Sequence, residues 1–469
     1  MKDAFLKAQN QASRDLRDSD PNRLAFHLMP PTGWLNDPNG LCQIGDEYHI
    51  FYQYAPEDPN GSSLKGWGHY TTRDFRTYKE EDIPLLPGSE IDKNGAYSGS
   101  AFQDGDTTHF FYTGNGKLEG DHDYINSGRL HWTNHFETRD GKTFSKKEVL
   151  MKNEDYPENL SCHVRDPKIL KEADGYYMVL GARTLDSAGQ INVFKSQDLK
   201  SWKPVSVIST PEPFGYMWEC PDLFDLDGKR ILITCPQGLE QKGIDYENIY
   251  QNGFFLVNGD LNHNITVKDF EELDRGFDFY APQTFEDNKG RRILIGWMGM
   301  PDAEYDNEPT VKFGWQHALT LPRELHYHNG RLYQYPVDEI LQLRKEGTAF
   351  RLEKNEPAKL DSSVFELILK PETDHFEVKL RKDVTLAYEG GIFSLDLGSS
   401  GQKRTVRHVP VDHIESLDIF SDTSSLEIFI NGGQQTMTTR VYDSQKDLKV
   451  ESSEPMEAVL YPLDPIAVL

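Results

Sequence analysis

Cysteine is scarce in this chain of 469 residues. The four thiols form no C-x-x-C pair and have no histidine partner at zinc-site spacing: Cys42, Cys162, Cys220 and Cys235. A disulfide framework and a zinc motif are therefore not expected, and reduced, buried thiols are the simplest interpretation. Cys220 is as readily a ligand contact as an apolar filler, because it follows an acidic residue inside a repeated motif described below.

Positive charge is also in short supply. Lys and Arg number 50 against 76 Asp and Glu, which gives a formal net charge of −26. Binding to nucleic acid requires a basic face that neutralises phosphates, so nucleic acid is excluded as an expected partner. The negative charge itself is typical of a soluble protein.

Long apolar runs are missing as well. No segment approaches the length of a membrane span, and Met1 to Asp20 has no apolar core like that of a signal peptide. We therefore expect no membrane partner and a cytoplasmic protein. Helix-period stretches are few, whereas aromatic residues make up 12% of the chain and Gly and Pro are frequent, which favours an all-β fold.

What the chain does contain is a repeat. Five times, a short strand is followed by a turn signal and a second strand rich in aromatic and β-branched residues, at intervals of about 60 residues. This period predicts a five-bladed β-propeller, with one blade per repeat. The first strands carry the motifs Asp37-Pro38-Asn39-Gly40-Leu41, Gly99-Ser100-Ala101-Phe102, Asp166-Pro167-Lys168-Ile169, Glu219-Cys220-Pro221-Asp222-Leu223 and Tyr280-Ala281-Pro282-Gln283-Thr284.

The patterning divides the chain into four parts. Residues 1–25 are predicted to form an N-terminal arm or helix, 26–336 the propeller, 337–349 a linker helix, and 350–469 a β-sandwich of alternating strands. The sandwich has no comparable acidic cluster, so we expect it to serve packing, or the formation of a homodimer.

Three of the motifs begin at a carboxylate: Asp37, Asp166 and Glu219. One acid in a turn is usually structural, but matched positions in a propeller meet at one end of the channel. Glu219 has apolar neighbours in the sequence, and loss of water around a carboxyl group favours its protonated form. Glu219 is therefore predicted to be the proton donor. The two aspartates have polar or cationic neighbours, which predicts ionised groups. Such a division of roles suits glycoside hydrolysis.

An ordered set of motifs runs along the chain: HLMPPTGWLNDPNG at 27–40, FYQY at 51–54, WGH at 67–69, YSGS at 97–100, RDP at 165–167, WECP at 218–221, YAPQ at 280–283, GWQH at 314–317, LPR at 321–323 and SLEIFING at 425–432. This set resembles family 32 glycoside hydrolases, the group of invertases, sucrose-6-phosphate hydrolases and fructan hydrolases. The resemblance implies a propeller joined to a sandwich and retention at the fructosyl carbon. It further implies that Asp37 is the nucleophile, Glu219 the acid/base and Asp166 the transition-state stabiliser.

The resemblance also implies a set of substrate-binding residues. Sugar hydroxyls need amide, carboxylate and hydroxyl partners above an aromatic floor. Arg165 is expected both to lower the pKa of Asp166 and to orient it. The matching positions are Asn36, Gln53, Trp67, Ser98, Arg165 and Tyr280, with Trp34 and Trp297 as walls.

The leaving group stays open at this point. Where many relatives carry a tryptophan, this chain has Asp58 to Leu64. Sucrose or short fructo-oligosaccharides are one prediction, and sucrose 6-phosphate is the alternative, with Lys168, Lys312, His317 and Arg323 as candidate phosphate partners. More remote alternatives are a non-catalytic sugar-binding propeller, an inverting hydrolase and a fructosyltransferase. No cofactor or metal is expected, because acid/base cleavage needs none and no calcium-loop motif is present.

Overall fold

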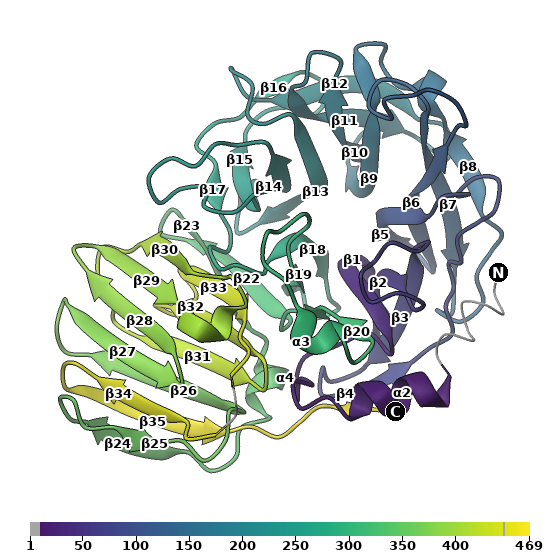
Figure 1. The fold of residues 1–469 in the computed structure, drawn as a ribbon. Coiled ribbons are helices and arrows are strands. Elements are labelled where there is room, and N and C mark those ends of the chain that lie inside the picture. Colours follow the sequence, from purple (N-terminus) through teal and green to yellow (C-terminus); the bar gives the residue numbers. More distant parts are fainter. Residues whose placement is uncertain (1–9, 444–445) are drawn as a thin grey trace.

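The computed structural model describes residues 10–443 and 446–469. It confirms the all-β prediction: five sheets surround a central channel, and two further sheets pack face to face beside them (Figure 1). Residues 1–9 of the predicted N-terminal arm lie outside the described residues. The described part of that arm contains helix α2 (Gln11–Asp18), which begins at Asn10, whose side chain accepts a hydrogen bond from the Ser13 amide.

Each propeller sheet begins with the strand that carries one of the five motifs, and this strand is the innermost of its blade. The strands of the five blades, in chain order within each blade, are β1 (Gly33–Ile44), β2 (Glu47–Ala55), β3 (Gly66–Thr72) and β4 (Thr77–Glu80); β5 (Ala96–Asp104), β6 (Thr107–Lys117), β7 (Arg129–Thr138) and β8 (Glu148–Met151); β9 (Leu160–Glu172), β10 (Gly175–Thr184), β11 (Gly189–Ser196), β12 (Lys203–Ser209) and β16 (Ile265–Thr266); β13 (Met217–Leu226), β14 (Lys229–Gln237), β15 (Gly253–Val257) and β17 (Glu271–Glu272); and β18 (Tyr280–Glu286), β19 (Arg292–Met298), β21 (Ala318–Leu319), β22 (Arg323–His328) and β23 (Arg331–Pro336).

The ring is closed by pairing between distant parts of the chain. Strand β20 (Trp315–Gln316) pairs in parallel with β1, and the last strand, β36 (Ala467–Val468), pairs in parallel with β4. The end of the chain thus returns to the first blade instead of lying in a sandwich sheet (Figure 1). Short helices α3 (Glu308–Val311) and α4 (Asp338–Leu341) lie in the connections after the fifth innermost hairpin.

The sandwich consists of two six-stranded antiparallel sheets. Alternate residues point inward, among them Leu367, Leu369, Val378 and Leu386, and form one apolar core. Burying each such side chain stabilises the fold by about 1.5–3 kcal/mol. In spatial order the sheets are β24 (Thr348–Leu352), β35 (Met456–Pro462), β26 (Phe365–Pro371), β31 (Leu417–Asp422), β32 (Ser425–Ile430), β33 (Gln435–Arg440); and β25 (Ala358–Lys359), β34 (Lys449–Ser452), β27 (Phe376–Arg381), β28 (Val384–Glu389), β29 (Ile392–Asp396), β30 (Val406–Pro410).

Buried ion pairs join the propeller to the sandwich. The ring of His27 lies between Asp422, at 2.8 Å from Nδ1, and Glu427, at 2.9 Å from Nε2. Arg323 of β22 also donates to Glu427, and Arg404 donates to Asp278. Because these charges are fully buried, removing one partner costs about 3–5 kcal/mol.

A β-bulge recurs where the five motifs lie. The register of the innermost hairpin shifts between Leu35 and Pro38, and equivalent shifts occur in β5, β9, β13 and β18. Bulges accommodate proline, which cannot donate to the ladder, and they redirect neighbouring side chains. In three blades the residue directly before the proline has positive φ: Asp166 at 63°, Cys220 at 50° and Ala281 at 45°. The bulges therefore hold motif side chains in place at one end of the channel.

Candidate active site

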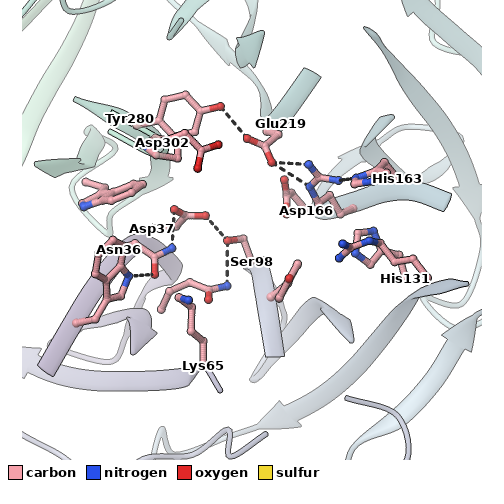
Figure 2. A pocket seen from close by; sticks show the side chains of 17 residues that line it. Asn36, Asp37, Lys65, Ser98, His131, His163, Asp166, Glu219, Tyr280 and Asp302 are labelled. Carbon is pink, nitrogen blue, oxygen red and sulfur yellow. Dashed lines mark hydrogen bonds and ion pairs between the residues drawn. The ribbon is translucent and has the colours of Figure 1, made fainter. Parts of the chain in front are cut away.

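One end of the channel opens into a cavity of about 410 Å³ that contains the three predicted acids (Figure 2). Asp37 comes from β1, Asp166 from β9 and Glu219 from β13, so blades one, three and four each contribute one carboxylate. The cavity is lined by Trp34, Asn36, Asp37, Gln53, Lys65, Tyr97, Ser98, Arg129, His131, His163, Arg165, Asp166, Glu219, Tyr280, Trp297, Pro301 and Asp302. Of the predicted catalytic and sugar-binding residues, all but Trp67 lie in this lining.

Asp37 is fixed by polar side chains from two blades. Ser98 Oγ donates to its Oδ2 at 2.5 Å, and Asn36 Nδ2 donates to its Oδ1 at 3.0 Å. A further shell holds these donors: Gln53 donates to Ser98, and the indole of Trp34 donates to Asn36. The Asp37 carboxylate is therefore oriented by a chain of hydrogen bonds before any ligand enters.

Asp166 is held by the backbone of the neighbouring blade. Its Oδ2 accepts a hydrogen bond from the Cys220 amide at 2.9 Å, and its own amide donates to Thr113 Oγ1. The thiol of Cys220 lies 3.8 Å from Asp37 Oδ2. Cys220 thus contacts both aspartates, one through its backbone and one through its sulfur. Asp166 and Cys220 both have a left-handed backbone. This conformation is strained at non-glycine residues, and such strain is common at functional sites.

Glu219 accepts more hydrogen bonds than the sequence indicated. Arg165 donates to Oε1 through Nε at 3.1 Å and through Nη2 at 2.5 Å. Tyr280 and Gln237 both donate to Oε2 at 2.7 Å. The apolar neighbours of Glu219 in sequence do not surround its carboxylate, because successive side chains of a strand point to opposite faces. The expectation that Glu219 has apolar surroundings is therefore wrong.

The two aspartates also differ from expectation. Burial raises the pKa of Asp37, and the nearby Glu219 charge raises it further, against the hydrogen bonds from Ser98 and Asn36. Burial raises the pKa of Asp166 to about 7, and the charges of Glu219 and Asp37 act in the same direction, whereas the charge of Arg165 and the Cys220 amide lower it. Both groups were predicted to be readily ionised. Three carboxylates in one desolvated cavity instead retain protons more tightly.

Two tryptophans form an aromatic corner of the cavity. The rings of Trp34 and Trp297 lie 5.9 Å apart between centroids, and His317 packs edge-on against both, at 4.4 Å and 5.0 Å. Burial lowers the pKa of His317, so this ring acts as a neutral support beneath the tryptophans.

Trp67 does not reach the cavity. Its side chain is 0% exposed, packs among Phe51, Tyr112 and Phe136, and donates through Nε1 to the Tyr97 carbonyl. The residue therefore supports the backbone of Tyr97, whose side chain lines the cavity. Its place in a family motif reflects packing between the first two blades.

The four candidate phosphate partners also lie outside the cavity lining. Lys168 is buried against Asp222 and the Thr284 carbonyl, and Arg323 is buried against Glu427. Instead, the cavity wall carries nitrogen-bearing residues that the sequence did not single out: Lys65, Arg129, His131 and His163. None of them recurs with the repeat, and only Lys65 lies close to a recognised motif, two residues before Trp67 of WGH.

A propeller that gathers three carboxylates with amide, hydroxyl and aromatic side chains at one end of its channel is the arrangement of a glycoside-cleaving enzyme. The model of the glycosyl hydrolases family 32 N-terminal domain matches residues 27–336, and that of the family 32 C-terminal domain matches residues 339–459. This chain belongs to glycosyl hydrolase family 32, as its motifs indicated.

Named relatives cover nearly the whole chain. It is 38% identical over 457 residues to the sucrose-6-phosphate hydrolase of Bacillus subtilis (strain 168), covering 93% of this chain and 92% of the relative. A sucrose-6-phosphate hydrolase structure from Lactobacillus gasseri has a TM-score of 0.88 at 29% identity, covering 98% and 97% of the two chains. A family 32 β-fructofuranosidase structure from Bombyx mori has a TM-score of 0.87 at 30% identity, covering 99% of each chain.

Proposed function

We propose that this chain is a retaining β-fructofuranosidase, which removes terminal β-D-fructofuranosyl residues from sucrose and short fructo-oligosaccharides. The observation that carries the proposal is the meeting of Asp37, Asp166 and Glu219 in one cavity of a family 32 chain. The β-fructofuranosidase and sucrose-6-phosphate hydrolase relatives support the choice of a fructosyl substrate.

In the proposed reaction, Asp37 attacks C2 of the fructosyl unit while Glu219 gives a proton to the glycosidic oxygen. The C2–O bond breaks, a bond forms between C2 and an Asp37 oxygen, and the leaving sugar departs with the proton. Glu219 then takes a proton from water, whose oxygen attacks C2 and releases fructose and the free Asp37 carboxylate. Asp166 accepts hydrogen bonds from fructose hydroxyls as positive charge develops on the ring.

The free site has to supply the proton for this step. Glu219 accepts hydrogen bonds from Arg165, Tyr280 and Gln237. Asp166, with its pKa raised to about 7, retains a proton near neutral pH beside it. We therefore treat the three acids as one proton-sharing cluster, in which substrate entry redistributes the proton toward Glu219.

Methanolysis tests this assignment. With sucrose in aqueous methanol, a fructosyl-enzyme passes its sugar to methanol with retention, so methyl β-D-fructofuranoside forms beside fructose and its configuration is read by NMR. The α-anomer as the first product would overturn the retaining mechanism. Glu219→Gln is expected to abolish hydrolysis and keep sucrose binding in calorimetry, which also separates an enzyme from a sugar-binding propeller.

A second candidate substrate is sucrose 6-phosphate, and the cavity wall favours it. Arg129 and Lys65 place cationic side chains in the cavity lining, and neither ring nitrogen of buried His131 has a hydrogen-bond partner among the described residues. A phosphate on the leaving glucose would find cationic partners there. The Bacillus subtilis and Lactobacillus gasseri relatives, named as sucrose-6-phosphate hydrolases, support this alternative.

Rates on three substrates decide between the two. Sucrose, sucrose 6-phosphate and 1-kestose are compared with purified protein and with Arg129→Gln. A phosphate-dependent enzyme has a much lower KM for the phosphorylated sugar, and Arg129→Gln removes that advantage while sucrose turnover stays unchanged. Equal or better turnover of unphosphorylated sugars would eliminate this alternative.

We further propose that the protein is cytoplasmic. That it forms a homodimer stays a prediction. None of the described residues forms a helix sufficiently long and apolar to cross a membrane. The four cysteines are free, as in proteins of reducing compartments. Light scattering after gel filtration measures the mass in solution, and cell fractionation with an antibody measures location.

A further inference from the structure

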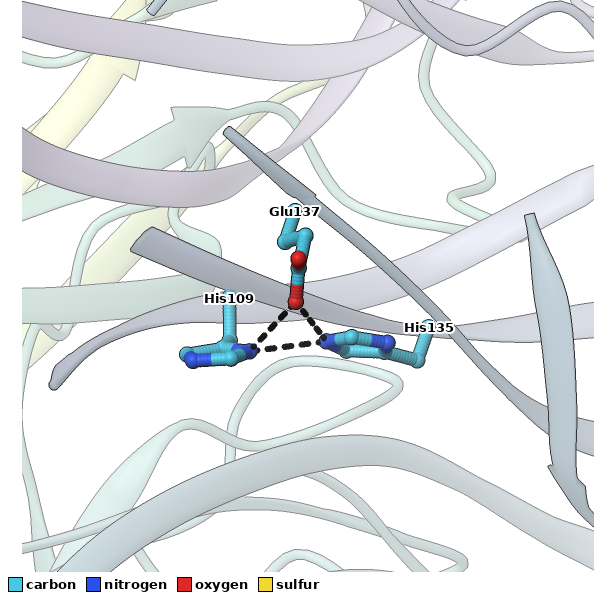
Figure 3. A group of neighbouring side chains, drawn as sticks. All are labelled: His109, His135 and Glu137. Carbon is cyan, nitrogen blue, oxygen red and sulfur yellow. Dashed lines mark hydrogen bonds and ion pairs between the residues drawn. The ribbon is translucent and has the colours of Figure 1, made fainter. Parts of the chain in front are cut away.

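The second blade contains a cluster of potential metal ligands, none of which belongs to the active-site lining (Figure 3). His109 lies on β6, and His135 and Glu137 lie two residues apart on β7, hence on one face of the strand. His109 pairs directly opposite Glu137 in the antiparallel register. The three side chains therefore converge across one pair of strands.

The donor atoms have the spacing of a metal site. His109 Nδ1 lies 2.9 Å from His135 Nε2 and 3.4 Å from Glu137 Oε2, and His135 Nε2 lies 4.0 Å from Glu137 Oε2. A triangle with these sides has its centre about 2.0 Å from every corner, which is the Zn–N and Zn–O bond length. An ion at this point would replace the proton that His109 Nδ1 donates to His135 Nε2, and the His109 ring would then carry its proton on Nε2.

A fourth side chain orients one of the ligands. Glu148 of β8 lies 2.9 Å from His135 Nδ1, so it accepts the ring proton and leaves the Nε2 lone pair facing the other two donors. A carboxylate behind a metal-binding histidine is a recurrent arrangement in zinc proteins.

The first blade provides an internal comparison. His49 Nδ1 and His69 Nε2 form an equivalent pair at 3.0 Å, with ring centroids 5.1 Å apart against 5.2 Å in the second blade. The residue opposite His49 is Thr71, where the second blade has Glu137. A paired histidine motif thus forms without a carboxylate, and the second blade adds one that completes a three-ligand set.

We propose that His109, His135 and Glu137 bind one divalent transition-metal ion, Zn²⁺ above all. Two imidazoles and one carboxylate suit zinc better than Ca²⁺ or Mg²⁺, which prefer oxygen ligands. The side chain of Glu137 is 40% exposed, so a water molecule can reach the fourth position. The ion would tie β6 to β7 and stabilise the blade.

The test uses untagged, full-length protein treated with EDTA and then titrated with ZnCl₂ in a calorimeter. One zinc ion per chain at micromolar affinity, with a rise in melting temperature, is expected. Glu137→Thr, which copies the first blade, loses this binding, and Glu148→Gln weakens it about 10- to 100-fold. Glu324→Thr is the matched control, because it removes a carboxylate on strand β22 that lies 3.2 Å from only one histidine, His326, and it keeps the wild-type isotherm.

Cobalt supplies a readout that a change in stability alone would not give. Co²⁺ in the wild-type protein is expected to give visible ligand-field absorption, and Glu137→Thr loses it while circular dichroism and sucrose hydrolysis stay unchanged. Absence of zinc uptake by the wild-type protein would overturn the proposal. So would unchanged stoichiometry and affinity in Glu137→Thr, because the metal would then be bound elsewhere.

Discussion

Arg165 binds Glu219, not the adjacent Asp166: two of its nitrogens donate to Glu219 Oε1, at 3.1 Å and 2.5 Å. The pair links blade three to blade four and fixes the carboxylate that we propose as acid/base. Arg165 also donates toward His163 Nδ1 at 2.6 Å, so the guanidinium is held on both sides.

Replacing Arg165 by Lys tests this positioning. Lysine keeps the charge but loses the planar pair of donors to Oε1, so Glu219 is less precisely placed. We expect kcat for sucrose to fall about 10- to 100-fold, with a smaller change in melting temperature than in activity. Activity equal to the wild type would show that the two-nitrogen contact has no part in positioning Glu219.

Ser98→Ala tests the environment of Asp37. The Ser98 hydroxyl bonds the Asp37 carboxylate and lowers its pKa, so its loss should raise that pKa further above the ordinary value. Since the nucleophile acts as an anion, the acid limb of kcat/KM should move to higher pH. Ser100→Ala is the control on the same strand, because Ser100 donates to the Pro167 carbonyl instead. A pH profile identical in Ser98→Ala and the wild type would contradict this role.

Asp166→Asn should stabilise the protein at alkaline pH while abolishing activity. The pKa of Asp166 is raised from 3.8 to about 7, so its favourable contribution is complete below pH 4 and is lost as pH rises through 7. Asparagine avoids burying a charge, so at pH 8 the free energy of unfolding should increase by a few kcal/mol. Denaturant titrations at pH 5 and pH 8 measure the difference, and a variant less stable than the wild type at pH 8 would refute it.

His27 should make stability depend on pH in the alkaline range. Hydrogen bonds and charges of Asp422 and Glu427 outweigh burial and raise its pKa from 6.5 to about 9. This contribution of about 3 kcal/mol is complete below pH 6.5 and is lost as pH rises through 9. His27→Gln should flatten the decline of melting temperature between pH 7 and pH 9. A slope equal to that of the wild type would contradict the assignment.

The repeat made the fold and the meeting of the three acids predictable, because equivalent strands of a propeller surround one axis. The partners of those acids were not predictable in the same way. Neighbours in sequence suggested Arg165 for Asp166, but a bulge and the alternation of a strand send its side chain to Glu219. Trp67 is a second example: its motif suggested a sugar contact, but its side chain packs between the first two blades.

Features formed by contacts between strands left no local signal. The sequence shows no pattern that relates Arg129 to His131 in the cavity wall, or that groups His109, His135 and Glu137. These residues come together only through the pairing register of β6 and β7. The raised pKa of Asp166 likewise depends on burial among other carboxylates, which no spacing records.

The most direct test of the central claim is to trap the fructosyl-enzyme. Glu219→Ala, incubated with an aryl β-D-fructofuranoside whose leaving group needs no proton, should accumulate the covalent intermediate because water is no longer deprotonated. Peptide mass spectrometry is predicted to find one fructosyl unit on the peptide that contains Asp37, and none in Asp37→Ala/Glu219→Ala. A fructosyl unit on another residue, or aryl alcohol released without any covalent adduct, would contradict the account.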